Sequence, residues 1–352
     1  MNLKYLSILM ISLMIILSGC SSSSDIAEVK KKEDKLKLSS VLIGDLKDNG
    51  DISLYTISNK KATFNITISR LMQLKYDKNY GVIGQLNFIE KGNNLIENQL
   101  IITKNDKDKV IEGLYSIVDF GISPKGRYLA YRGFKEDKIE SIDNLKILDL
   151  TEDKSIKINS KVIISGSLYG FKDENTLFYY GVSEETNKSA LYEYNIKTNK
   201  EQILYDINLG YITYVKALDD NKLIILEDKI NSSELSLFCP DTKAKEVISS
   251  NITSVYSSIN KQGDLYFIAN DKSESKALYR YADKKLKRLT YDFPKHIYDK
   301  SGLGVDDNEN LYFIGYDEDE NKRNIFSVGQ DGSINLISNE EGKYILYENI
   351  SY

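Results

Sequence analysis

Histidine and cysteine, the residues that most often build metal sites and nucleophilic dyads, are scarce in this chain of 352 residues. His296 is the one histidine, and the two cysteines, Cys20 and Cys239, stand far apart. A lone histidine cannot form a site of two or three imidazoles, and neither cysteine belongs to a ligand-spaced pair. No glycine-rich phosphate loop is present either. We therefore expect no metal site and no cofactor, with His296 in a structural or surface role.

Candidate nucleophiles are equally weak. The run Gly166-Ser-Leu-Tyr-Gly170 has two glycines, but its serine occupies the wrong position for a Gly-x-Ser-x-Gly elbow. We expect a bend between strands there. Cys239 lies in an apolar run that ends at Pro240, which predicts a buried or half-buried strand residue. No histidine flanks it, so the sequence offers no reason for a lowered thiol pKa.

Carboxylates are the one chemical group present in numbers. Asp45–Asp51 and Asp317–Asn321 resemble calcium loops at first sight. The first has Thr56 where the bidentate glutamate should stand, and the second lacks the central glycine. We expect a hairpin turn and a solvated loop. Pairs of acids that meet across a channel would still allow carboxylate-based chemistry on a polysaccharide, as a lyase or a hydrolase.

The first 20 residues carry a second kind of chemistry. Lys4 precedes an apolar run from Leu6 to Leu17, which is too short to span a bilayer core of about 30 Å. The run ends in Leu17-Ser18-Gly19-Cys20. This tetrapeptide resembles the bacterial lipobox, which implies cleavage before Cys20 and a diacylated Cys20 sulfur. An ordinary cleaved signal with an incidental cysteine is the alternative.

The lipobox resemblance sets the predicted boundaries. Residues 1–19 would be a lipoprotein signal peptide, and the protein would be anchored by lipid on the extracytoplasmic face of the bacterial cell membrane. Residues 20–38 are polar and of mixed charge, which predicts a disordered tether. Its lysines could touch anionic lipid, although a solvated spacer is the simpler interpretation. With Cys20 lipidated, Cys239 has no disulfide partner within the chain.

The residues after the predicted tether contain a repeated unit, and this unit would position the side chains of any functional site. Ile122–Gly133 combines a tight turn with a strand, and the chain repeats this pattern four more times. The equivalent leucines are 48, 46, 42 and 46 residues apart: Leu129, Leu177, Leu223, Leu265 and Leu311. A period of about 40–50 residues with several strands per unit is typical of a β-propeller. We expect all five leucines to be buried on the second strand of their blades.

Each unit contains four predicted strands joined by short polar turns, which favours an all-β fold. Two weaker units precede the five clear ones, so residues 39–352 are predicted to form seven four-stranded blades, with six or eight as alternatives. The first unit lacks an innermost strand, and Tyr344–Tyr347 is a strand without a blade. We expect this C-terminal strand to pair with Val41–Gly44 and close the ring.

Ser123–Tyr131 carries a family resemblance. Its Ser-Pro-Lys-Gly-Arg-Tyr-Leu-Ala-Tyr run is similar to the Ser-Pro-Asp-Gly repeat of TolB-type propellers and of the N-terminal domains of prolyl oligopeptidases, with Lys125 in place of the usual aspartate. The resemblance implies a propeller fold and transfers no function. The last predicted blade reaches the end of the sequence, so we expect no hydrolase domain after it.

Composition and loop content indicate the kind of partner. The net charge of −5 argues against nucleic acid. The loops between second and third strands vary most, lean acidic and hold few large aromatic residues: Glu90–Glu97, Phe134–Asp143, Val182–Ser189, Glu227–Glu234, Asp271–Lys276 and Tyr316–Arg323. We expect a monomeric, non-enzymatic scaffold that binds a protein or a polar or cationic ligand on one propeller face. The carboxylate enzyme is the alternative.

Overall fold

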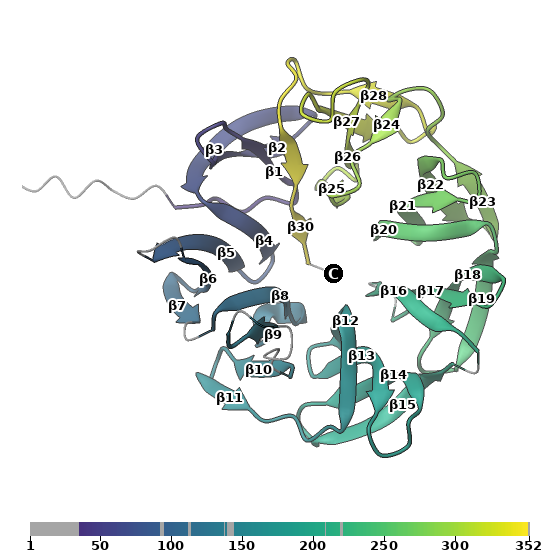
Figure 1. Cartoon of the computed structure of the whole chain (residues 1–352). Coiled ribbons are helices and arrows are strands. Elements are labelled where there is room, and N and C mark those ends of the chain that lie inside the picture. Colours follow the sequence, from purple (N-terminus) through teal and green to yellow (C-terminus); the bar gives the residue numbers. More distant parts are fainter. Residues whose placement is uncertain are drawn as a thin grey trace, which may run out of the picture. The chain divides into compact units, whose positions relative to one another are not determined.

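A computed structural model describes residues 35–91, 95–111, 114–136, 138, 144–207, 209–218 and 221–350. The chain divides into two units, of which the second, Leu36–Tyr352, is compact. The second unit is an all-β propeller of seven blades with almost entirely antiparallel pairing, which confirms the predicted fold class and blade count (Figure 1).

Blades 1 and 2 are built from both ends of the chain. Blade 1 has the strand order β29-β1-β2-β3, and blade 2 has the order β30-β4-β5-β6-β7. Their bounds are β1 Leu42–Leu46, β2 Asp51–Ser58, β3 Lys61–Ser69, β4 Leu71–Asp77, β5 Val82–Lys91, β6 Leu95–Lys104, β7 Lys107–Ile111, β29 Tyr344–Leu346 and β30 Glu348–Asn349.

Blades 3 to 5 each use four consecutive strands, and the innermost strand of each comes first in the sequence. Blade 3 has β8 Ser116–Ile122, the 3-10 helix η1 Pro124–Gly126, β9 Tyr128–Phe134, β10 Lys146–Asp149 and β11 Lys154–Ile156. Blade 4 has β12 Val162–Asp173, β13 Thr176–Ser183, β14 Ser189–Asn195 and β15 Lys200–Asp206. Blade 5 has β16 Tyr211–Ala217, β17 Leu223–Lys229, β18 Ser232–Cys239 and β19 Ala244–Ser249.

Blades 6 and 7 complete the ring. Blade 6 has β20 Ile252–Lys261, β21 Asp264–Asp271, β22 Lys276–Ala282 and β23 Lys285–Arg288. In blade 7 two short strands, β24 His296–Ile297 and β25 Gly304–Val305, share the innermost position and both pair with β26 Leu311–Tyr316. β27 Asn324–Val328 and β28 Ile334–Leu336 follow as the third and fourth strands.

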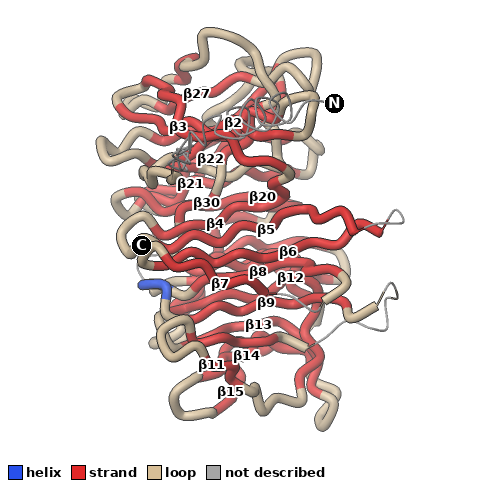
Figure 2. Tube along the Cα trace, turned by 90° about the vertical axis from the view of Figure 1, so that its left-hand side faces the viewer, coloured by secondary structure: helices blue, strands red, loops and turns tan. Residues whose placement is uncertain are grey.

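The strand directions define two faces. Turns between first and second strands, and between third and fourth strands, lie on one side, which we call the turn face. Several of the latter are two-residue turns with both residues at positive φ, such as Asn59-Lys60 and Asp283-Lys284, as right-twisted hairpins favour. Loops between second and third strands, and the connections between blades, lie on the opposite side, which we call the loop face. In Figure 2 the turn face, marked by η1 and the C-terminal end, is on the left.

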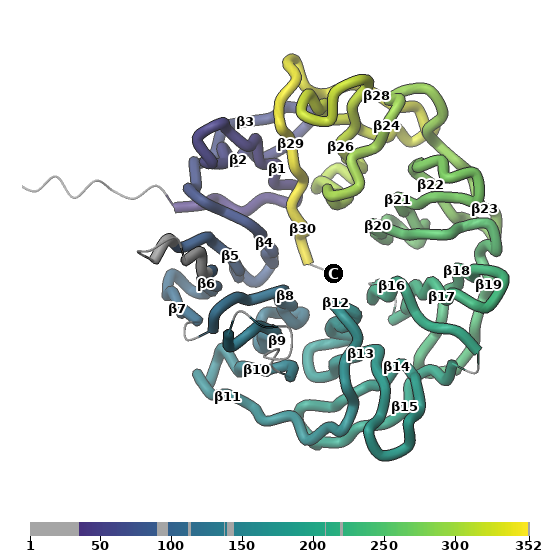
Figure 3. Tube along the Cα trace, viewed as in Figure 1, coloured from purple at the N-terminus to yellow at the C-terminus, as the bar shows by residue number. Residues whose placement is uncertain are grey.

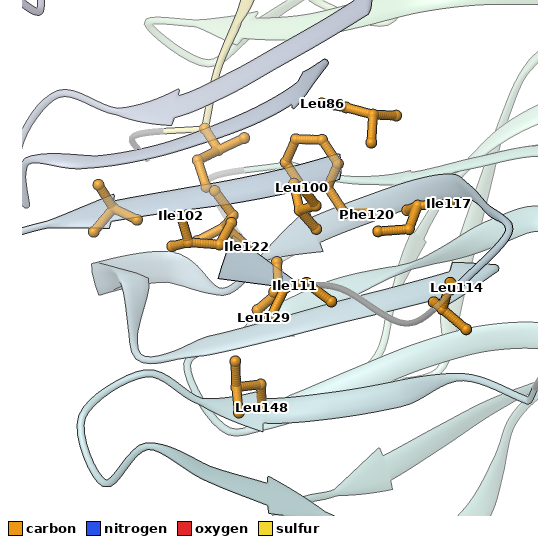
Figure 4. Packing of buried hydrophobic residues seen from close by; sticks show 12 residues of the cluster. Leu86, Leu100, Ile102, Ile111, Leu114, Ile117, Phe120, Ile122, Leu129 and Leu148 are labelled. Carbon is orange, nitrogen blue, oxygen red and sulfur yellow. The ribbon is translucent and has the colours of Figure 1, made fainter. Parts of the chain in front are cut away.

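The apolar core is divided among the interfaces between blades. Seven clusters of buried side chains fill the seven interfaces, and Figure 4 shows the one between blades 2 and 3. The five repeat leucines, predicted to be buried on second strands, are at most 3% exposed and lie on β9, β13, β17, β21 and β26. Burial of a leucine of this kind stabilises the fold by a few kcal/mol, about 2–5 when measured by truncation to alanine.

Closure of the ring follows the prediction. Ile43 pairs with Leu346 and Gly44 with Ile345, so β29 supplies the missing innermost strand of blade 1. The chain then crosses to the next blade, where β30 runs parallel to β4 and the amide of Ile350 donates to the Tyr76 carbonyl. Figure 3 shows this terminal segment in yellow, first beside β1 and then towards β4.

One local expectation is wrong. Gly166–Gly170 is no bend between strands, because it lies inside the single strand β12. Pairing with β13 is regular up to Ile164 and resumes at Tyr169, so the intervening residues form a wide bulge with Gly166 at a φ of +53°. Bulges of this kind bend an innermost strand and re-aim its side chains.

Candidate functional site: the central channel

The innermost strands surround a cavity of about 710 Å³ at the centre of the ring. β4, β8, β12, β16 and β20 all contribute to its wall, together with the segment that leads from β24 to β25 and the C-terminal residues 345–348 and 350. Because each blade supplies its first strand, residues far apart in the sequence face one another here. A concave site with mixed polar and apolar walls is the usual setting of a ligand pocket.

An ion triad lies in this cavity. Glu348 on β30 accepts from Lys216 at 2.7 Å and lies 3.7 Å from the ammonium of Lys75. Burial alone would raise the pKa of Glu348, but the two lysines outweigh it and lower the pKa to about 2. The carboxylate is therefore ionised at every physiological pH. Lys75 also lies over the ring of Phe120, 5.6 Å from its centroid.

A second polar group joins blades 3 and 4. The hydroxyl of Tyr169 donates to one oxygen of Asp119, and Arg132, which pairs with Asp119 across β8 and β9, donates to the carbonyl of Gly166 in the bulge. Burial and the charge of Asp119 raise the pKa of Tyr169 well above its usual value. The other oxygen of Asp119 and the Nε of Arg132 are buried without a hydrogen-bond partner. These contacts fix the bulge against the neighbouring blade.

The remaining wall of the cavity is also pre-organised. Asp299 pairs with Lys276, Tyr214 shares a hydrogen bond of 3.0 Å with Ser258, and Ser301 accepts the Leu346 amide at 2.8 Å. Each described carboxylate that lines the cavity, namely Asp119, Asp299 and Glu348, thus has a hydroxyl or an ammonium group bound to it. A wall whose carboxylates are held in place by such contacts suits recognition of a shape with a few polar groups.

The sequence candidates lie elsewhere. His296 is exposed on β24, its ring 5.1 Å from that of Tyr316. The acidic runs form the β1–β2 turn and the exposed β26–β27 loop, as predicted. Cys20 lies outside the described residues. No group of metal-binding side chains occurs among the described residues, and no described helix is long and apolar enough to cross a membrane.

Cys239 is half-buried at the end of β18, as predicted, and is a free thiol. Its pKa is lowered, chiefly by hydrogen bonds from the side chain and backbone of Thr242. The cause is a contact from the following turn, which the sequence around the cysteine does not reveal.

Sequence reasoning also missed where the large apolar side chains of the loop face reside. The loops between second and third strands are poor in aromatic residues, but the blade connections and the strand ends beside them are not. Leu209 and Tyr211 precede and begin β16, and Tyr291 and Phe293 precede β24; all four are exposed. The sequence signal that could have revealed them is an apolar residue in a short connection between blades, where polar residues are usual.

Comparisons with known proteins show the fold. No protein-family model and no curated protein sequence matches the chain. Among solved structures, a prolyl endopeptidase superposes with a TM-score of 0.56 at 14% identity, over 90% of this chain and 51% of the endopeptidase. Dipeptidyl peptidase 4 of Porphyromonas gingivalis gives a TM-score of 0.53 at 14% identity, over 88% of this chain and 54% of the peptidase. The chain thus spans about half the length of these enzymes.

TolB of Acinetobacter baumannii is also similar, with a TM-score of 0.45 and 11% identity over 87% of this chain and 82% of TolB. The similarity to the prolyl endopeptidase and to dipeptidyl peptidase 4 supports the propeller fold. At these identities the similarity concerns the fold alone.

Proposed function

We propose that this chain is a lipid-anchored extracytoplasmic protein whose propeller binds a protein or a polar ligand without catalysing a reaction. The observation that carries the proposal is the central cavity of about 710 Å³, walled by polar groups that are held in place by their neighbours. Such a wall costs little to reorganise when a ligand binds, and this pre-organisation favours affinity.

The state of Glu348 argues against it as the proton donor of the alternative, a carboxylate enzyme acting on polysaccharide. Hydrolysis of a glycosidic bond needs a carboxylic acid that stays protonated near neutral pH, and therefore a raised pKa. Glu348 has the opposite shift, to about 2. Its two lysines make it a fixed charge rather than a proton donor.

A cavity-blocking variant tests the binding role. Ser167 lies on the exposed part of the β12 bulge and lines the cavity, so Ser167→Trp should fill the site without disturbing the blade cores. We expect Ser167→Trp to abolish recovery of the partner or ligand from cell extract, measured by quantitative mass spectrometry. Thr198→Trp, in an exposed turn of the same blade, is the matched control. New reducing ends or unsaturated sugars released from envelope polysaccharide by the wild type, but not by Asp299→Asn, would overturn the non-enzymatic role.

The anchor makes a separate prediction. If Cys20 carries lipid, Cys20→Ala should abolish labelling by a fatty-acid probe and should release the protein into the medium or leave an uncleaved precursor. Cys239→Ala, which removes the other thiol, should label like the wild type. Unchanged labelling of Cys20→Ala would refute the lipoprotein assignment and the proposed location.

A further inference from the structure

Five exposed apolar side chains gather on the loop face where blades 4 and 5 meet. They expose between 39% and 80% of their surface: Ile163, Val182, Leu209, Tyr211 and Ile230. Ile163 begins blade 4 in β12, Val182 ends β13, Leu209 and Tyr211 lie at the start of β16, and Ile230 lies in the turn after β17. We call these residues the blade 4/5 patch.

The two parts of the patch lie on adjacent blades. Ile163 and Val182 are directly opposite one another across β12 and β13, so their side chains lie on the same side of the sheet. Tyr180, two residues before Val182 and on the same side, is close enough to Tyr211 to influence its pKa. β12 and β16 are neighbours, and the buried cluster that contains Tyr180, Ile207 and Ile212 fills the space between the blades. Ile163 and Val182 therefore lie at the solvent-facing end of that cluster.

The rim of the patch is negatively charged. Glu184 and Glu185 follow Val182 and form no ion pair among the described residues, and Asp228 accepts a hydrogen bond from Tyr211. The basic residues of the same loops are mostly engaged elsewhere. Lys188 pairs with Asp206 at 2.6 Å, and Lys229 pairs with Glu234 at 2.9 Å. Lys161 remains, so that three carboxylates against one ammonium leave a local charge of −2.

We propose that the blade 4/5 patch docks a protein segment that is both apolar and basic, with aliphatic or aromatic side chains for the patch and Lys or Arg for its rim. Exposed apolar side chains that gather on one part of a protein surface mark an interaction site. The charge selects among occupants: a second copy related by two-fold symmetry would place −2 against −2, and anionic lipid would be repelled in the same way. The patch extends the proposed binding role and is independent of the central cavity.

A synthetic peptide tests the proposal directly. The probe is a short fluorescein-labelled peptide of Leu, Phe and Lys, and its twin has Glu in place of every Lys. Binding to the full chain in nanodiscs of uncharged phosphatidylcholine is measured by anisotropy. We expect the basic peptide to bind at least tenfold more tightly than its twin. Ile163→Ser combined with Leu209→Ser should weaken binding at least tenfold, whereas Leu336→Ser, an exposed leucine on β28, should leave it unchanged.

Charge reversal separates the two components of the site. Glu184→Lys with Glu185→Lys should reverse the preference in favour of the acidic twin, while the adjacent pair Glu340→Lys and Glu341→Lys on another loop should not. All these side chains are exposed, so unchanged melting temperatures serve as the folding control.

Several results would overturn the proposal. The first is no binding of the basic peptide, and the second is equal binding of both peptides. The third is dimerisation of the full chain that Ile163→Ser abolishes, since a second copy would then be the occupant. The fourth is loss of peptide binding in Ser167→Trp, which would move the peptide into the cavity. Retained peptide binding in Ser167→Trp, with no ligand found for the cavity, would contradict only the proposed cavity function.

Discussion

Blades 1 and 4 have the same four-stranded architecture but depend on the chain in different ways. Blade 4 is one continuous run from β12 to β15, so three short connections keep its strands together. Blade 1 takes β1, β2 and β3 from the start of the propeller and β29 from its end, and only hydrogen bonds and packing hold β29 in place. The strands of blade 4 are neighbours in the sequence, so little chain entropy is lost when they pair. In blade 1, pairing of β29 with β1 closes a loop of almost the whole chain, and the entropic cost is larger.

The C-terminal segment compensates with contacts to four blades. Leu346 pairs with Ile43 in blade 1, its amide is bound by Ser301, and its carbonyl accepts the amide of Gly302 in blade 7 at 3.3 Å. Two residues later, Glu348 reaches blade 2 through β4 and blade 5 through Lys216. A short segment therefore links several blades that no peptide bond joins at this point.

The largest expected effect comes from removing this segment. Deletion of residues 342–352 should destabilise the whole domain by at least about 5 kcal/mol, because the buried side chains of Leu346, Tyr347 and Ile350 are lost together. Thermal unfolding followed by circular dichroism measures it. Removal of 184–187 from the β13–β14 loop of blade 4 should cost far less. A deletion mutant that melts at the wild-type temperature would show that closure contributes nothing to stability.

The same substitution, one leucine to alanine, compares the stability contributed by β29 in blade 1 with that contributed by a strand of blade 4. Leu346→Ala and Leu177→Ala should each cost about 2–5 kcal/mol, since both side chains are at most 3% exposed. Urea titration gives both values on one scale. If Leu346→Ala costs under about 1 kcal/mol while Leu177→Ala costs the full amount, the ring must already open at β29 in solution.

Two glycines test the tightness of closure. A Cβ on Gly44 would lie 2.6 Å from Ile52 and 2.8 Å from the ring of Tyr347, whereas one on Gly121 would meet nothing nearer than 3.9 Å. Gly44→Ala should therefore cost about 1–3 kcal/mol through overpacking, and Gly121→Ala should be close to neutral. Equal effects in urea titration would mean that Tyr347 moves aside at no cost.

The smallest expected effect concerns pH. The pKa of Glu348 is depressed from 4.5 to about 2, so its contribution is complete above pH 4.5 and disappears as the pH falls towards 2. The shift corresponds to about 3 kcal/mol at most, and roughly half of that is expected because 35% of the side chain is exposed to water. Glu348→Gln should be less stable than the wild type at pH 7 by this amount, with the difference vanishing near pH 2. A pH-independent difference would contradict the ion triad.

The propeller was predictable because each blade repeats its own local signals. Leu129 and its four equivalents marked the buried second strands. Tyr344–Tyr347 indicated ring closure because it was a strand without a blade and the first unit lacked an innermost strand. The cavity was not predictable in the same way. Lys75, Lys216 and Glu348 meet only because blades 2 and 5 and the C-terminal strand reach one point in the ring, and no local pattern around any of these residues specifies that meeting.

The bulge in β12 and the blade 4/5 patch escaped prediction for related reasons. Ser165–Leu168 has the polarity of a bend, and only the pairing of residues on either side with β13 identifies it as part of one strand. Leu209 and Tyr211 resemble the start of an ordinary strand, and nothing in that pattern indicates that both side chains are exposed.

Because β29 leaves the ribosome after every other strand of blades 1 and 3 to 7, blade 1 must wait for it throughout synthesis. Until residue 346 has emerged, Leu42 and Ile43 belong to a three-stranded sheet in which the inner side of β1 is unpaired. The central channel then lacks the part of its wall that β29 supplies. The nascent chain is therefore exposed to proteases and to mispairing for the whole time that it takes to make the other blades, and a holding chaperone would have most to protect at β1.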